Sequence, residues 1–171
     1  VDLNLYRFHK VPKYMQDVAP GAADATRTPP FAISFVREPP EEEGEARGRF
    51  DRELDLPRVA QLLTVLGSTE ADGDVVRVDA GVEAHGDGTL VARAEDGKSA
   101  KDLLEKARQL VVRAELCVGC GVCVPRCPTG ALSIEDMRVV LDEGECVHCG
   151  SCFGPCAVVD FPPVVVDIGP H

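Results

Sequence analysis

The chain has 171 residues, of which 44% are hydrophobic and 27% are charged, a composition typical of a globular protein rather than a disordered one. Its net charge of −11 argues against nucleic-acid binding, because duplex binding needs clustered Lys and Arg to displace counterions. An acidic surface suits a redox protein that docks on a basic partner, or it serves only to keep the chain in solution.

The sequence shows no membrane or export signal. No apolar run approaches the ~20 residues that a membrane-spanning helix requires, and residues 1–10 lack the apolar stretch of a signal peptide. We therefore expect a cytoplasmic protein with no membrane contact. Because the first residue is Val1, we expect a chain that is processed, starts at an unusual codon, or is the tail of a longer protein.

Proline and acidic residues distinguish the first region, residues 1–50. Two Pro-Pro pairs and the acidic run Glu41–Glu43 predict an extended, Pro-rich N-terminal arm, because Pro at this density breaks helices and strands. A basic and aromatic cluster from Arg7 to Tyr14 is either a partner-docking segment or a solvated tail.

Residues 51–110 are predicted to form a small α-β-β-β-α domain. A helix is expected from Pro57, which suits a first helical turn, to Gly67, with apolar residues between them at helical spacing. A second helix is expected to start at Ser99, which would cap it. Three strands are expected between the helices, the last two as a hairpin, at residues 75–78, 82–85 and 89–94. This region contains no catalytic constellation.

All eight cysteines lie in the last region, residues 111–171, and form an internal repeat. Each run has the spacing C-x2-C-x2-C-x3-C, and the two runs are Cys117, Cys120, Cys123 and Cys127, then Cys146, Cys149, Cys152 and Cys156. Thiolates at two-residue gaps can converge on the irons of one metal-sulfur cube, and glycines between them let the backbone come close. The spacing therefore predicts iron-sulfur ligation.

Three other uses of the cysteines compete with this interpretation. Structural zinc sites use four ligands in two separated pairs, unlike these evenly spaced quartets. Disulfides belong to secreted chains, and this sequence has no sign of secretion. Free core cysteines would not repeat at a fixed spacing. Iron-sulfur binding is thus the favoured interpretation.

The two runs, with Pro128 after Cys127, resemble those of the bacterial-type two-cluster ferredoxins. The resemblance implies two 4Fe-4S clusters with crossed ligation, in which the fourth cysteine of each run binds the other cluster. It assigns the first cluster to Cys117, Cys120, Cys123 and Cys156, and the second to Cys127, Cys146, Cys149 and Cys152. Cys156 departs from the family pattern, since Pro155 precedes it and no Pro follows.

The same resemblance implies an α+β chain whose residues 111–171 form a pseudo-symmetric dicluster ferredoxin domain. Its halves would share a small sheet, with the clusters packed under two short helices. A hairpin is expected at residues 131–134 and 138–141, with outer strands at 111–114 and 164–168. His148, between Cys146 and Cys149, either modulates the second cluster's potential through its charge or is a surface residue without a role.

A longer stretch is similar to the C-terminal redox part of archaeal proteins of the phosphoadenosine phosphosulfate reductase family. The similarity rests on Leu5–Met15, on Gly48–Gly67 and on the sequence around both cysteine runs. The nucleotide-binding domain of that family carries a Ser-Gly-Gly-x-Asp-Ser loop, which is absent from this sequence. The resemblance therefore implies kinship to the redox tail and not sulfonucleotide reductase activity.

Three functions follow from these patterns. The first is electron transfer through two 4Fe-4S clusters, as a carrier or as a redox subunit of an oxidoreductase complex with a fixed redox partner protein. The second is a detached redox module of a sulfonucleotide-reductase-like enzyme whose catalytic half lies elsewhere. The third is a structural iron-sulfur scaffold or interaction subunit. The first is favoured because cysteine quartets of this kind usually carry electrons.

Overall fold

The computed structural model describes residues 33–154, 156–160 and 165–167. The cluster predicted from Arg7 to Tyr14 lies outside these described residues. The strands are β1 (Phe35–Glu38), β2 (Glu45–Phe50), β3 (Thr69–Asp72), β4 (Val75–Val78), β5 (Val82–His85), β6 (Thr89–Arg93), β7 (Leu132–Glu135), β8 (Arg138–Leu141) and β9 (Val165–Asp167). The helices are α3 (Leu56–Leu63), α4 (Gly97–Leu116), the 3-10 helix η2 (Val124–Arg126) and α5 (Ala157–Asp160).

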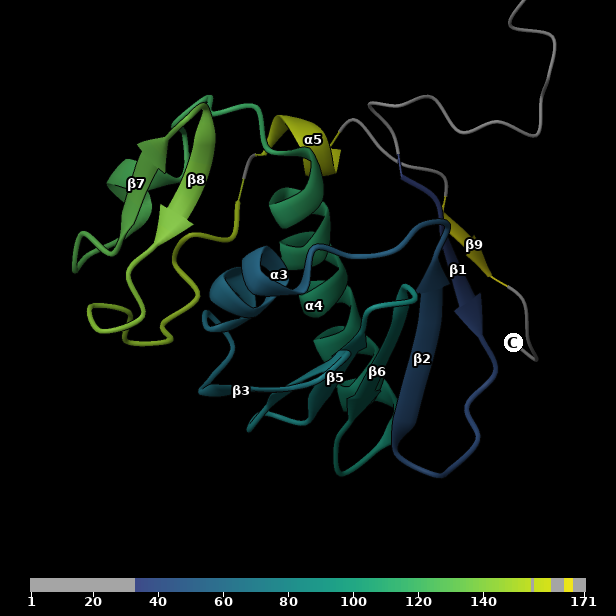
Figure 1. Ribbon diagram of the computed structural model, residues 1–171. Coiled ribbons are helices and arrows are strands. Elements are labelled where there is room, and N and C mark those ends of the chain that lie inside the picture. Colours follow the sequence, from purple (N-terminus) through teal and green to yellow (C-terminus); the bar gives the residue numbers. More distant parts are fainter. Residues whose placement is uncertain (1–32, 155, 161–164, 168–171) are drawn as a thin grey trace, which may run out of the picture.

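The described residues form a large sheet, a pair of helices packed on it, and a separate hairpin (Figure 1). The sheet has the order β3-β4-β5-β6-β2-β1-β9, and its strands pair antiparallel except for β1 with β9. Within the described residues, strands β7 and β8 pair with each other and with no other strand. Helices and a mostly antiparallel sheet make this an α+β structure, as the sequence predicts.

Strands β1 and β2 correct the prediction of an extended arm for residues 33–50. The two strands pair antiparallel with each other, and β2 also pairs with β6. Phe35 and Phe50 lie opposite each other in the register, with ring centroids 4.7 Å apart, and both side chains are buried. An aromatic cross-strand pair stabilises a sheet beyond its local propensity. This long-range pairing is why the Pro-rich composition misled the prediction.

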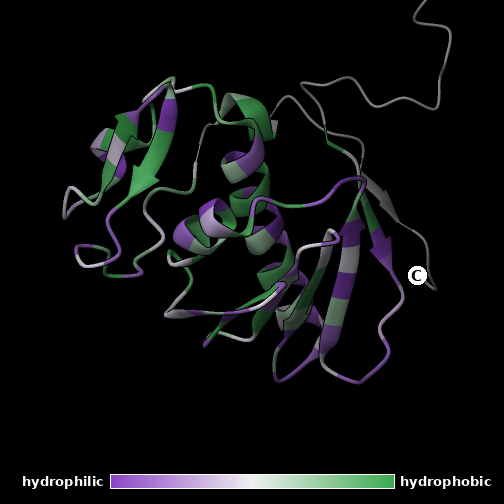
Figure 2. Ribbon diagram, viewed as in Figure 1, coloured by the Kyte–Doolittle hydropathy of each residue, from purple (hydrophilic) through white to green (hydrophobic). Residues whose placement is uncertain are grey.

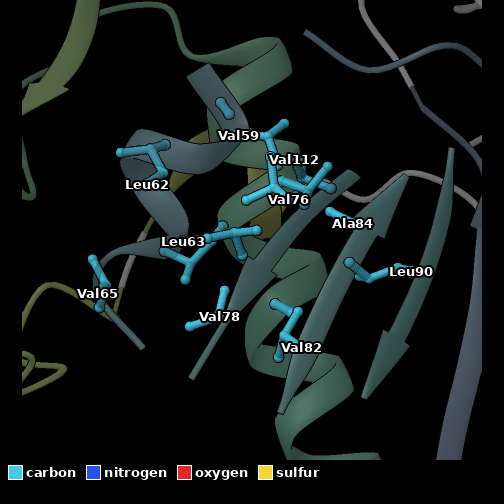
Figure 3. Packing of buried hydrophobic residues seen from close by; sticks show 14 of the residues in the cluster. Val59, Leu62, Leu63, Val65, Val76, Val78, Val82, Ala84, Leu90 and Val112 are labelled. Carbon is cyan, nitrogen blue, oxygen red and sulfur yellow. The ribbon is translucent and has the colours of Figure 1, made fainter. Parts of the chain in front are cut away.

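The core lies between the sheet, α3 and α4. Helix α4 packs against β6, β2 and β5, while α3 packs against β3, β4, β5 and α4. Figure 3 shows Val59 and Leu63 of α3 converging with Val76 of β4 and Val112 of α4, and all four are buried. Each such side chain stabilises the fold by roughly 1.5–3 kcal/mol. The helix predicted after Pro57 is confirmed, but it ends at Leu63 and not at Gly67, and the strands β4, β5 and β6 are confirmed.

Helix α4 differs from its prediction at both ends. Its N-cap is Asp96 and not Ser99: Asp96 Oδ1 accepts a hydrogen bond from Ser99 N at 2.7 Å. At the other end α4 runs past residue 110 to Leu116, so the strand expected at 111–114 is wrong. Those residues are buried in the core, and packing of an amphipathic face overrides the strand propensity of Val. The predicted domain boundary at residue 110 therefore falls inside a continuous helix.

The hairpin of β7 and β8 lies on the far side of α3 and α4 from β1 and β2 (Figure 1). Its predicted position is confirmed. Strand β9 falls where an outer strand was predicted, but it pairs with β1 of the large sheet, so the shared small sheet expected around the clusters is not observed among the described residues. Figure 2 shows β8 as largely hydrophobic, and its Val139 and Leu141 are buried.

None of the helices in the described part of the chain has the length and apolar character needed to cross a bilayer.

Candidate iron-sulfur centre

The cysteines occupy loops between α4, the hairpin and α5. Cys117 is the C-cap residue of α4, so that helix sets where the first run begins. The 3-10 helix η2 separates Cys123 from Cys127, and α5 begins directly after Cys156. Helix η2 thus lies inside the first run, whereas α5 follows the second run.

The two loops nevertheless repeat each other in backbone conformation. Gly119 and His148 hold equivalent positions in the runs and have φ of +72° and +57°, while Gly121 and Gly150 have φ of +77° and +73°. Left-handed backbone is readily adopted by glycine but is strained for a residue with a Cβ. His148 thus adopts a conformation that the repeat imposes on its position.

Burial repeats as well. In each run the second cysteine is exposed, the third is buried, and the first and fourth are half-buried. The residue after the first cysteine is exposed to nearly the same extent in the two runs, 56% for Val118 and 57% for Val147. The burial of the four cysteines therefore follows the same order in the two runs.

One pocket collects cysteines from both runs. Cys127 of the first run lines it together with the first three cysteines of the second run, Cys146, Cys149 and Cys152. The remaining walls include the apolar side chains of Val65, Leu132 and Leu141. In the first run, Cys123 lies close enough to Cys117 and Cys156 for their charges to act on its thiol. The tertiary structure thus places Cys127 beside the second run and Cys156 near Cys117 and Cys123 of the first run.

Backbone N–H groups point at the sulfurs. Cys117 Sγ accepts hydrogen bonds from Gly119 N at 3.4 Å and from Val139 N of β8 at 3.3 Å. Cys127 Sγ accepts one from Ala131 N at 3.2 Å. Such bonds favour the thiolate, which is the form that binds iron, and they tune the potential of a bound cluster. Soft thiolates with backbone donors around them fit an iron-sulfur group.

Two opposite effects act on the thiol pKa values. A hydrogen bond with the Thr129 hydroxyl lowers the pKa of Cys127, and a hydrogen bond with the Ser151 hydroxyl lowers that of Cys149. Burial raises the pKa of Cys123 and of Cys152, and the charge of Arg113 acts in the opposite direction on both thiols. Hydrogen bonds from neighbouring hydroxyls therefore favour the thiolate at Cys127 and Cys149, while Arg113 partly offsets the effect of burial at Cys123 and Cys152.

Arg113 was not predicted as a site residue. Arg113 lies in the last turn of α4 and is only 3% exposed. Its Nη1 donates a hydrogen bond to the carbonyl of Cys152 at 3.2 Å. The signal in the sequence was a cation within the apolar stretch 111–114, directly before the first cysteine. A charged residue in a buried helical face needs a partner, which points to a nearby anionic site.

His148 contacts the end of α3. Its Nδ1 makes a short hydrogen bond with the carbonyl of Thr64, and Cys146 Sγ lies 3.9 Å from the same oxygen. The second cysteine loop is thereby anchored to the helix-sheet core. An influence of His148 on a cluster potential stays a prediction.

None of the eight cysteines forms a disulfide. Within the part of the chain that the structure describes, no three His, Cys, Asp or Glu residues are arranged to hold a single metal ion.

Residues 110–133, which contain the first cysteine run, match the family described as the 4Fe-4S binding domain, Fer4. Two curated relatives have similar sequences. One, the polyferredoxin protein MvhB of Methanothermobacter marburgensis, is 48% identical over 75 residues, covering 38% of this chain and 17% of the relative. The other, a subunit of the ion-translocating oxidoreductase complex of Methanosarcina acetivorans, is 35% identical over 40 residues, covering 23% of this chain and 15% of the relative.

The chain thus spans less than a fifth of the length of these two relatives. No solved structure matches it significantly. Neither relative's name refers to sulfonucleotide reduction, so the resemblance to that family stays a prediction. The match of the cysteine run and the two relatives agree on one chemistry: the chain carries a ferredoxin-type 4Fe-4S binding domain, a kind of domain that typically transfers electrons.

Proposed function

We propose that the chain binds two 4Fe-4S clusters with crossed ligands and passes single electrons between them as a module of an oxidoreductase complex. The proposed ligands are Cys117, Cys120, Cys123 and Cys156 for cluster 1, and Cys127, Cys146, Cys149 and Cys152 for cluster 2. Thiolate-bound cubes supply one-electron redox chemistry over a wide range of potentials.

The position of Cys127 carries this proposal. It lines a pocket with three cysteines that follow it by 19 or more residues in the sequence, and not with its own neighbours in the first run. A pocket walled by four thiols and apolar side chains provides soft ligands and a low dielectric, the two features that hold an iron-sulfur cube. The repeated φ angles of the two loops support a second site of the same kind.

The exposed cysteines define where electrons would enter and leave. Cys120 and Cys149 are exposed, and they belong to different proposed clusters. Cys123 and Cys152, also from different clusters, are both buried and both near Arg113. Each cluster would therefore have one thiolate at the surface and one facing the other cluster, an arrangement suited to carrying an electron through the domain.

A partner protein would dock beside the first loop. Three large apolar side chains are exposed there: Val118, Val122 and Met137, the last at 74%. Gly119 packs against the backbone of Met137, so the loop and the hairpin turn form one surface. By its name one relative belongs to an oxidoreductase complex, and we propose such a setting for this chain.

Iron and acid-labile sulfide analysis of the anaerobically purified full chain tests the proposal. Two cubes require about eight irons and about eight sulfides per chain. Stoichiometric zinc without sulfide would refute it, and four irons per chain would refute the second cluster. Reversible reduction followed by EPR, with the protein remaining folded, distinguishes an electron-transfer role from a structural scaffold.

A further inference from the structure

Arg113 is a buried cation without a counter-anion among the described residues. Arg113 is 3% exposed, and no ion pair joins its guanidinium to a carboxylate in the part of the chain that the structure describes. Its Nη1 donates to the carbonyl of Cys152, but its buried Nε has no hydrogen-bond partner. Burying a guanidinium costs free energy that one carbonyl does not offset, so the site is incomplete as a protein-only structure.

Arg108 on the same helix shows how a buried arginine is usually stabilised, by a carboxylate partner. It is also buried, but its Nε and Nη2 donate to the two carboxylate oxygens of Glu105, at 2.9 and 2.6 Å. Helix α4 therefore carries two buried arginines, of which one has a bidentate carboxylate partner and the other faces the cysteine loops. Arg113 differs in that it contacts both runs: its backbone carbonyl accepts a hydrogen bond from Cys117 N at 3.1 Å, and its Nη1 donates to the carbonyl of Cys152 at 3.2 Å. Its charge also acts on the thiols of Cys123 and Cys152.

We propose that Arg113 is the counter-cation shared by both clusters, and that it raises both reduction potentials. This inference rests on the proposed function, since Cys123 and Cys152 are assigned to different clusters. A thiolate-bound cluster is an anion, and reduction adds a further negative charge. A buried cation stabilises the reduced state more than the oxidised state, and at low dielectric its effect is little screened. Arg113 is thus a positioning and tuning residue and not a ligand.

The test compares four variants of the full chain. Arg113→Met removes the charge while keeping most of the volume, and Arg113→Lys keeps the charge. Arg126→Met is the matched control for charge, because Arg126 is exposed and its Nη1 donates to the carbonyl of Phe153, next to Cys152. Arg108→Met is the control for loss of a buried arginine on α4. Iron and sulfide content is measured first on the wild type, so that failure of the two-cluster proposal is recognised separately.

EPR-monitored redox titration gives the main result. Arg113→Met is expected to shift the equilibrium of each one-electron reduction about tenfold toward the oxidised state, which lowers each potential by about 59 mV. Arg126→Met should give a smaller shift at either cluster, because water and salt screen an exposed charge. Arg113→Lys should stay close to the wild type. Unchanged potentials in Arg113→Met, a shift at only one cluster, or equal shifts in the Lys and Met variants would overturn the proposal.

Arg108→Met should leave both potentials close to those of the wild type, because Arg108 pairs with Glu105. A shift as large as that of Arg113→Met would mean that loss of any buried arginine on α4 disturbs the clusters, and it would overturn the proposal.

Discussion

Gln61 Oε1 accepts a hydrogen bond from Leu141 N at 3.3 Å, a contact that joins α3 to the end of β8 across 80 positions of sequence. It attaches the hairpin beside the cysteine loops to the helix-sheet core. Leu141 N is part-buried in this contact, and an unpaired buried amide costs more than the net value of one hydrogen bond.

We therefore expect Gln61→Ala to lower the free energy of unfolding by about 1–2 kcal/mol, measured by chemical denaturation of the holo-protein. Gln109→Ala is the control: Gln109 Nε2 donates to Glu105 Oε1 at 3.2 Å, within α4. Its loss should cost less than about 0.5 kcal/mol, as for other pairs one turn apart on a helix. Equal losses in the two variants would show that the hairpin does not depend on Gln61 for its attachment.

Gly119 tests the close packing of the first cysteine loop on the hairpin turn. A Cβ at this position would lie 2.6 Å from the carbonyl carbon of Met137, and its φ is +72°. Gly130 has a similar φ of +70° but open space around it. Gly130→Ala should therefore cost about 1 kcal/mol from backbone strain alone.

Gly119→Ala should cost about 1–3 kcal/mol more than Gly130→Ala, because the added methyl group must displace backbone. The stability of both variants is measured by thermal unfolding of the holo-protein, and their iron content is determined alongside. Full iron content with equal stability in the two would contradict the close contact between Gly119 and Met137.

Crossed ligation predicts which cluster a single substitution removes. Cys127→Ala should damage the cluster held by Cys146, Cys149 and Cys152, although Cys127 belongs to the first run. Cys156→Ala should damage the other one. Mössbauer and EPR spectra of the two variants should therefore lose different signals, each with about half the iron. The opposite assignment, with Cys127→Ala removing the cluster of its own run, would be fatal to the crossed arrangement.

Removal of iron with a chelator and an oxidant should unfold the cysteine loops and spare the helix-sheet core. Small metal-binding regions draw much of their folding free energy from ligation. Amide hydrogen exchange of the apo-protein should show protection lost at residues 131–141. Protection should persist at Val59–Leu63 and through Val112, because α4 is buried against the sheet there. Full protection of the hairpin in the apo-protein would mean that the fold does not need the clusters.

Residue patterns within a single segment predicted the helices and strands that depend mainly on that segment's own sequence. The apolar periodicity after Pro57 predicted α3, the strands expected at residues 75–78, 82–85 and 89–94 correspond to β4, β5 and β6, and the hairpin expected at 131–134 and 138–141 corresponds to β7 and β8. Strands β1 and β2 could not be predicted in this way, since they exist by pairing with each other and with β6. The predicted cap at Ser99 failed because Asp96 caps the helix three residues earlier, where it accepts a hydrogen bond from Ser99 N.

The sequence by itself determined the chemistry of this protein: two cysteine runs at identical spacing select soft metal-sulfur ligation, because ligand type and local chain reach decide which group binds. Only the tertiary structure decided how the runs combine. Cys127 lines one pocket with the cysteines of the second run, and Arg113 is a buried cation because α4 continues past residue 110 to the first cysteine run. Such contacts arise from long-range packing, which residue spacing does not encode.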